Sequence, residues 1–298
     1  MSEWDDKFAS WANGPGTTEQ TKCENAETAI RKALAAHEKL VLMDIAVFAQ
    51  GSYRNKTNVK QDSDVDICVR LNSAFFPDYP DGKKHEDFGN SASSITFADY
   101  KDLVQKALED YFDEDSVARG DKAFNIHANT YRIDADVVAT FEHRRYASNA
   151  DGSHYYLSGI GFKTDAGKLI LNWPNQHYDN GLKKHDETAR RFRKVIRILK
   201  RLRNEMQDEG NTDADGIASC LIESLVWNVP NDGFGHETYR EDVRYVLAHI
   251  FNNTGKDADC SEWGEVSELK YLFRSTQPWT RDQAHVFISA AWDYVGFE

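Results

Sequence analysis

The chain has 298 residues, 40% of them hydrophobic and 29% charged, and its net charge of −13 argues against a constitutive nucleic-acid binder that neutralises phosphates. No apolar run reaches the length of a membrane span, and the acidic N-terminus lacks the basic-then-apolar layout of a secretory signal. The four cysteines are far apart without a C-x-x-C pair, which argues against a zinc ribbon and fits four thiols in a reducing cytoplasm.

The N-terminal part of the chain predicts strands mixed with helices. After a turn-rich stretch over 1–16, Thr17 or Thr18 is expected to cap the first helix. The elements predicted from periodicity and turn residues are a helix over 17–37, strands over 45–49 and 64–71, a loop over 72–94, a helix over 97–112, hairpins over 122–138 and 142–168, and a strand over 169–172.

The C-terminal part predicts helices almost throughout. Residues 175–181 are expected to form a turn, and from Lys183 the apolar period becomes helical. Further helices are predicted over 214–227, 237–252 and 280–295.

The most informative stretch runs from Gly51 to Leu71, GSYRNKTNVKQDSDVDICVRL. Strand alternation sends Val65 and its apolar neighbours to one face and Asp64 and Asp66 to the other. Two neighbouring carboxylates repel each other, and their hard oxygens suit Mg²⁺. The Gly51-Ser52 turn offers backbone N–H groups and a hydroxyl to the phosphates that accompany Mg²⁺.

The identity of the carboxylate pair has one alternative, because Asp62 continues the alternation and could pair with Asp64. The apolar residues Val65 and Ile67 bracket Asp66, which favours Asp64 with Asp66.

A third carboxylate is expected from the strand that ends in ADVV. Asp134 and Asp136 share one face of that strand. Asp136 precedes the apolar run Val137-Val138-Ala139 and should lie deeper in the sheet. A site for two metal ions needs such a third anionic ligand, so we prefer Asp136.

The helix after Lys183 is strongly basic within an acidic chain. One interpretation is a solvated face with internal salt bridges. The other is that Lys194 or Lys200 neutralises a triphosphate, with Ser219, near the start of the next helix, as a phosphate donor. Ser219 could equally be a helix-packing serine.

In this order, the motifs resemble the bacterial cGAS/DncV-like nucleotidyltransferases, most closely their E clade, which makes cyclic dinucleotides in anti-phage operons. The resemblance rests on QGSYRNKTNVKQDSDVDICVRLNS, ADVV, NWPNQHYDNG, the Lys/Arg helix and the Ser219–Pro230 segment. It implies an α+β fold with a polymerase-β-like nucleotidyltransferase core and mixed sheet over 1–172. A helical lobe over 173–298 would close the nucleotide cleft.

The resemblance also implies roles for individual residues. Carried over position by position, the ligands of two Mg²⁺ ions, for which Mn²⁺ can substitute, are Asp64, Asp66 and Asp136. Gly51 and Ser52 match the phosphate-binding turn, and the residues in segments that touch the donor triphosphate are Lys194, Lys200 and Ser219. Asn172 matches a base-reading position associated with uracil, although the same amide also suits adenine.

The expected function is cytoplasmic synthesis of a cyclic dinucleotide from two nucleoside triphosphates, with release of pyrophosphate. The resemblance implies a monomer without membrane or stable nucleic-acid partners, whose product acts on a separate effector protein. Two alternatives stay open: a transferase acting on RNA ends or a small-molecule hydroxyl, and a non-catalytic nucleotide- or RNA-binding module.

Overall fold

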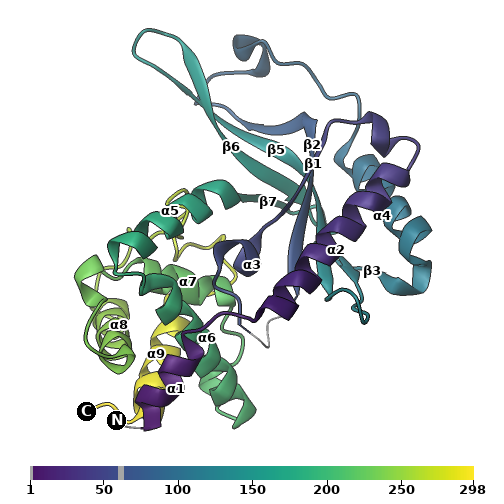
Figure 1. The fold of residues 1–298 in the computed structure, drawn as a ribbon. Helices are drawn as coiled ribbons and strands as arrows, with labels where there is room; N and C mark the ends of the chain where they lie inside the picture. The colour runs from purple at the N-terminus through teal and green to yellow at the C-terminus, as the bar shows by residue number, and fades with distance from the viewer. Residues whose placement is uncertain (1–2, 60–63) are drawn as a thin grey trace. The chain divides into compact units, whose positions relative to one another are not determined.

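The computed structural model describes residues 3–59 and 64–298, which form two compact units (Figure 1). We call Gly16–Arg54 with Ser63–Pro174 the sheet unit, and Met1–Pro15 with Asn55–Asp62 and Asn175–Glu298 the helical unit. The sequence prediction assigns all of 1–172 to one lobe. The structure instead groups the first fifteen residues and the segment that follows Arg54 with the C-terminal helices.

The strands of the sheet unit form one mixed sheet within the described residues, in the order β1-β2-β5-β4-β3, with β6 on β5 and β7 on β6. Strand β2 runs parallel to β5 and antiparallel to β1. The strands are β1 Ile45–Ala49, β2 Val65–Asp78, β3 Val117–Arg119, β4 Phe124–Ile126, β5 Ala135–Ser148, β6 His154–Lys163 and β7 Leu169–Asn172. The predicted mixed sheet is therefore confirmed.

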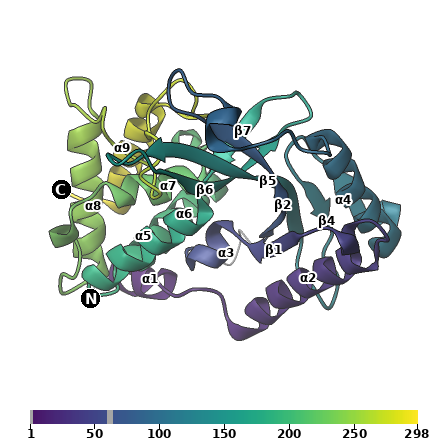
Figure 2. The same ribbon diagram turned by 90° about the horizontal axis from the view of Figure 1, so that it is seen from above.

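One face of this sheet is covered by two helices, α2 (Thr17–Ala36) and α4 (Phe97–Phe112), as Figure 2 shows. The apolar residues of β2 pack with these helices in one core: Val65, Ile67, Val69 and Leu71. The hydroxyl of Tyr100 in α4 donates to the Val69 carbonyl over 3.1 Å. The predicted alternation is confirmed, and it leaves Asp66 on the opposite face.

Strand β2 is longer than predicted. The stretch expected to begin a loop at residue 72 continues as strand to Asp78. After a register shift between Leu71 and Phe75, β2 resumes its pairing with β5, with Phe75 opposite Glu142. This second half depends on pairing with a distant strand, which local turn residues do not reveal. The short elements of the sheet unit are α3 Gly51–Asn55, η1 Leu40–Leu42, η2 His85–Phe88 and η3 Glu114–Ser116.

The helical unit contains α1 Glu3–Trp11, α5 Pro174–Glu187, α6 Phe192–Asp208, α7 Ser219–Trp227, α8 Tyr239–Thr254, α9 Arg281–Val295, η4 Thr212–Ala214 and η5 Asn231–Gly233. Its core gathers the apolar stripe of α6 with residues of α7, α8 and α9. Capping boxes begin two of these helices, with Thr238 and Glu241 at α8 and Thr280 and Gln283 at α9. No helix in the described part of the chain is both long and apolar enough to cross a bilayer.

Two helices occupy stretches that the sequence predicts as turns. In α1, Phe8 is fully buried in the core of the helical unit, so tertiary packing stabilises a short segment of weak periodicity. In α5, Pro174 takes the first helical position, where proline is favourable. Gly181 is buried inside this helix, and a β-carbon added there would meet Phe192 and Val266 at an ordinary van der Waals distance of 3.8 Å.

The basic helix also begins later than predicted. Ala189 and Arg190 have φ values of 48° and 60°, which interrupt the helix expected from Lys183. The Thr188 hydroxyl then accepts the backbone N–H of Phe192, the first residue of α6, over 3.1 Å.

Candidate functional site

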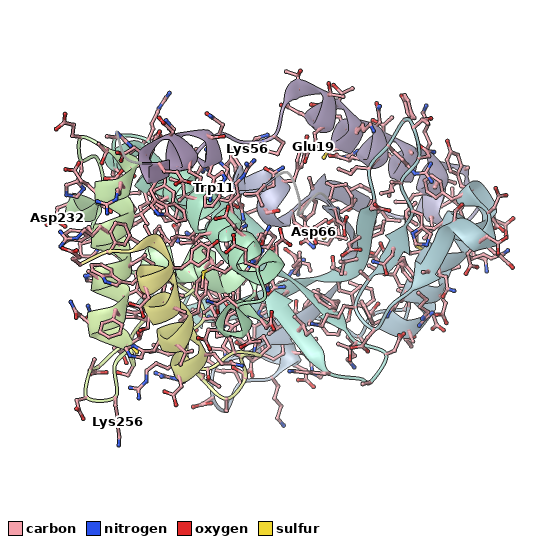
Figure 3. All side chains as sticks on the ribbon, turned by 90° about the horizontal axis from the view of Figure 1, so that it is seen from below. Trp11, Glu19, Lys56, Asp66, Asp232 and Lys256 are labelled. Atoms are coloured by element: carbon pink, nitrogen blue, oxygen red, sulfur yellow. The ribbon has the colours of Figure 1, made fainter. Side chains whose placement is uncertain are left out.

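A row of polar residues crosses the sheet at the start of β2. Asp66 of β2 lies opposite Asp136 of β5, which lies opposite Asn125 of β4. On the other side, Gln50 donates its backbone N–H to the Asp66 carbonyl over 2.8 Å. Strand pairing thus places the two half-buried carboxylates predicted from separate motifs on neighbouring strands. Figure 3 labels Asp66 among the side chains.

The Gly-Ser turn lies directly against this row. Gly51 begins α3 with a φ of +62°, a conformation that favours glycine. A β-carbon built on Gly51 would lie 2.9 Å from the carboxyl carbon of Asp66 and closer still to its Oδ2. Because residue 51 has no side chain, the turn can lie directly against the Asp66 carboxylate.

The carboxylate of Asp136 is held by its neighbour on β4. The Asn125 side-chain amide donates a hydrogen bond to Oδ1 of Asp136. Burial raises the pKa of Asp136, while the bond from Asn125 opposes this rise and the charge of Asp134 adds to it. The environment of Asp136 thus favours proton uptake more than that of an exposed aspartate.

Asp134, the alternative third carboxylate, makes two hydrogen bonds near the start of the paired strands. Its Oδ1 accepts the backbone N–H of Ala128 over 2.6 Å, and its carbonyl accepts the N–H of Val65 over 3.0 Å. Both hydrogen bonds stabilise the backbone at the points where β2 and β5 begin. Asp64 is exposed just before β2, and Asp62, its alternative partner, lies outside the described residues.

The donor set fits a hard divalent cation. Asp64, Asp66 and Asp136 offer carboxylate oxygens, the ligands that Mg²⁺ prefers. Within residues 3–59 and 64–298, no three acidic, histidine or cysteine side chains are already gathered as a metal cluster. The fit therefore rests on the register of Asp66 with Asp136 and on the alternation that brings Asp64 to the same face.

The predicted base-reading residue, Asn172, ends β7 opposite Ile160 of β6. A β-carbon on the neighbouring Gly159 would lie 2.7 Å from the Asn172 carbonyl oxygen and 2.9 Å from the Trp173 indole. Trp173 is buried, and the Arg145 guanidinium lies 4.4 Å from its ring centre. Close packing on both sides thus fixes the backbone that carries Asn172.

The three residues predicted to contact a triphosphate lie in different environments of the helical unit. Lys194 is half-buried, with its ammonium 5.8 Å from the Tyr239 ring centre. Ser219 begins α7 and accepts a hydrogen bond from Arg203 over 3.1 Å. Lys200 is fully buried and donates to Glu223 over 2.7 Å, an environment that argues against a direct role of Lys200 at a solvated phosphate. The triphosphate contacts stay predictions from the family resemblance.

The other cations of α6 explain part of its basic character. Arg197 donates to the backbone carbonyls of Ala12 and Lys56, and Arg203 donates to that of Ile217. These buried guanidinium groups hold segments of the helical unit together. They fit neither the predicted solvated face nor a phosphate site.

Two polar residues, one in each unit, are missed by sequence reasoning. Asn125 carries no motif, and its position opposite Asp136 follows only from strand pairing. Glu223 leaves a stronger signal, because it is the single charged residue of α7, SCLIESLVW. A lone acid in an apolar helix indicates a buried ion pair, since an unpaired buried charge is too costly.

Comparisons with known proteins match both parts of the chain. Residues 29–115 match the nucleotidyltransferase domain, and residues 179–296 match the cGAS/DncV-like nucleotidyltransferase C-terminal helical domain. The chain is 41% identical over 294 residues to the cyclic dipyrimidine nucleotide synthase CdnE of Cecembia lonarensis, covering 98% of each protein. It is 35% identical over 302 residues to the cyclic dipurine nucleotide synthase of Elizabethkingia meningoseptica, covering 100% of each.

The fold has similar solved structures. The Rhodothermus marinus CdnE c-UMP-AMP synthase, solved with Apcpp and Upnpp, gives a TM-score of 0.85 at 29% identity. The match covers 98% of this chain and 97% of that one. The similarity therefore extends over both units.

Proposed function

The chain belongs to the cGAS/DncV-like nucleotidyltransferases, and we propose that it joins two nucleoside triphosphates, at least one of them a pyrimidine nucleotide, into a cyclic dinucleotide. The protein is an enzyme of the nucleotidyltransferase class, and the family forms cyclic dinucleotides from nucleoside triphosphates. The observation that carries the proposal is the register of Asp66 with Asp136 beside the Gly51 turn.

The choice of bases rests on Asn172. Similar full-length relatives are named for dipyrimidine and for dipurine products, so overall similarity alone does not select the bases. The Asn172 amide offers a donor and an acceptor side by side, complementary to O4 and N3–H of uracil. Because the same amide suits adenine, the proposal includes both cyclic UMP-UMP and cyclic UMP-AMP.

We assign the divalent cations to the three carboxylates. Asp64, Asp66 and Asp136 would hold two Mg²⁺ ions, for which Mn²⁺ can substitute. When bound, the ions neutralise the triphosphate and lower the pKa of the attacking ribose hydroxyl. The Gly51-Ser52 turn supplies backbone N–H groups and a hydroxyl that orient the donor phosphates.

The reaction then needs one proton acceptor and one leaving group. The ribose oxygen of the acceptor forms a bond to the α-phosphorus, and the bond from that phosphorus to pyrophosphate breaks. Asp136 serves either as an ion ligand or as the base that takes the hydroxyl proton, a role that its raised pKa supports. A second transfer within the linear dinucleotide closes the ring.

The test is incubation with all four ribonucleotides and Mg²⁺ or Mn²⁺, followed by mass spectrometry of phosphatase-resistant products. We expect a cyclic dinucleotide that contains uracil, and no pyrophosphate release from a variant with both Asp64→Asn and Asp66→Asn. Unchanged turnover in that variant refutes the mechanism, and a product without uracil refutes the role of Asn172.

We also propose the setting in which the product acts. The motif resemblance supports a monomer in the bacterial cytoplasm whose product activates a separate effector in anti-phage (CBASS) signalling. Sedimentation tests the monomer, and phage challenge of cells carrying the effector and either the wild type or the double variant tests the signalling role.

A further inference from the structure

A buried polar cluster surrounds Glu223 in the helical unit. Its Oε1 accepts hydrogen bonds from Lys200 over 2.7 Å and from the Thr57 hydroxyl over 2.5 Å, and its Oε2 contacts Nε2 of His177 over 3.0 Å. Lys200 is 0% exposed and Glu223 is 4% exposed. One carboxylate thus joins α5, α6 and the segment after α3, which all belong to the helical unit.

The charge of Glu223 is balanced inside the cluster. Burial alone would raise the pKa of Glu223, but the charge of Lys200 and the hydrogen bond from His177 outweigh burial and lower it. Glu223 is therefore ionised at neutral pH. Hydrogen bonds to an ionised acceptor are roughly twice as strong as those between neutral groups, so Thr57 is held firmly.

The segment that carries Thr57 is also held through its backbone. Arg197 donates to the carbonyl of Lys56, and Lys56 has a φ of 58°, a conformation that costs energy for a residue with a side chain. Thr57 is 2% exposed and Val59 is 0% exposed. Figure 3 labels Lys56. A strained, buried segment keeps its conformation only where its surroundings impose it.

This segment joins two parts of the proposed active site along the chain. Lys56 alone separates the end of α3 at Asn55 from Thr57, and α3 begins with the Gly51-Ser52 turn. Seven positions after Thr57, the chain reaches Asp64. A change in the position of Thr57 is therefore transmitted through one residue to the helix that carries the phosphate turn.

We propose that Glu223, acting through the Thr57 hydroxyl, is a positioning residue for nucleotidyl transfer that fixes residues 55–59, directly after the phosphate turn. The inference rests on the proposed function, because it assigns the phosphate turn to catalysis. Misplacement of reacting groups by about 1 Å costs on the order of 10²-fold in rate. The burial of Lys200 is then explained by its role as the cation that keeps Glu223 charged.

The test replaces the Thr57 hydroxyl and leaves the buried ion pair intact. Thr57→Val removes one hydrogen bond at nearly constant volume, and we expect kcat for pyrophosphate release to fall 10- to 100-fold with KM within threefold of wild type. Thr57→Ser restores the hydroxyl and should restore kcat to within threefold. The matched control is Thr254→Val, which removes another buried threonine hydroxyl of the helical unit, bonded to the Ile250 carbonyl. It should lower Tm similarly and leave kcat unchanged.

A second readout does not depend on activity. Amide hydrogen exchange over residues 51–59 should rise in Thr57→Val and stay at the wild-type level in Thr57→Ser and Thr254→Val. The proposal is overturned if Thr57→Val keeps both kcat and exchange protection, or if Thr57→Ser fails to restore them. A wild type that makes no cyclic product would refute the proposed function, whereas the exchange measurement would still decide whether Thr57 holds the segment.

Discussion

Gly51 lies so near the carboxylate of Asp66 that a β-carbon built on it would overlap that group, so the phosphate turn and a proposed metal ligand meet with no side chain between them. The Gln50 N–H bond to the Asp66 carbonyl fixes the two backbones at this point. In the proposed reaction, the donor phosphate would contact both the turn and the cation. The contact of Gly51 with Asp66 is the feature that would permit such an arrangement.

We predict that Gly51→Ala reduces pyrophosphate release at least 100-fold, because the new methyl group would overlap the Asp66 carboxylate. Gly89→Ala is the control, since Gly89 has a similar φ of +66° but nothing within 4 Å of an added β-carbon. Both variants should lose about 1 kcal/mol of unfolding free energy from the unfavourable backbone conformation. Equal activity of the two variants would show that the contact with Asp66 is not required.

Two neighbouring aspartates on one strand give a second prediction. Asp136→Asn should lower pyrophosphate release at least 100-fold, because it removes a carboxylate opposite Asp66. Asp134→Asn should stay within threefold of wild type, since an asparagine oxygen can still accept the Ala128 N–H. Similar losses in both variants would contradict the assignment of Asp136 as the third carboxylate.

This assignment shows how far the sequence determines the site. Local alternation predicts that Asp64 and Asp66 share a face, because the period of a strand depends only on its own residues. The pairing of Asp66 with Asp136 joins strands 70 positions apart, and periodicity contains no information on register. Sequence reasoning prefers Asp136 through its apolar neighbours, and only the fold places it opposite Asp66.

Lys200 illustrates why side-chain roles are harder to predict than elements. Its helix is amphipathic and basic, which suggests cations that face solvent or phosphate. The structure buries Lys200 because Glu223, 23 positions later, provides an opposite charge in the interior. Helix α5 differs from its predicted turn for a related reason, since burial of Gly181 and Lys184 in the helical unit outweighs the local turn propensity.

The hydrogen bond from Asn125 to Asp136 leads to a third prediction. In Asn125→Ala the carboxylate of Asp136 loses a donor that fixes its orientation, so the Mg²⁺ concentration for half-maximal activity should rise five- to tenfold. Asn149→Ala is the control, because Asn149 also donates its amide to a side-chain oxygen, that of Ser153. A Mg²⁺ dependence identical to wild type in Asn125→Ala would exclude this role.

The last prediction concerns pH and His185, which lies in the final turn of α5. Its Nδ1 accepts the backbone N–H of Arg193, in the first turn of α6, over 3.3 Å. A protonated ring cannot accept this bond. Burial and the charges of Arg193 and Arg197 lower the pKa of His185 to about 4, with Asp186 opposing them.

The direction of the effect follows from the two pKa values. The unfolded chain gains a proton on His185 near pH 6.5, whereas the folded protein resists protonation down to about pH 4. The stability contributed by neutral His185 is therefore complete above pH 6.5 and is lost as the pH falls toward 4. Each unit of difference between the folded and unfolded pKa values corresponds to about 1.4 kcal/mol of stability. Because the ring is only half-buried, we expect less than the whole difference would give, a loss of about 1–2 kcal/mol in total.

Urea unfolding of wild type and His185→Asn between pH 7.5 and 4.5 measures this contribution. The asparagine oxygen can accept the Arg193 N–H without titrating, so the variant should match wild type near pH 7.5. As the pH falls, the variant should become about 1–2 kcal/mol more stable than wild type, because the titration of His185 is absent. Parallel stability curves over this range would mean that His185 titrates alike in the folded and unfolded chain, and the role of its neutral ring as acceptor of the Arg193 N–H would then be wrong.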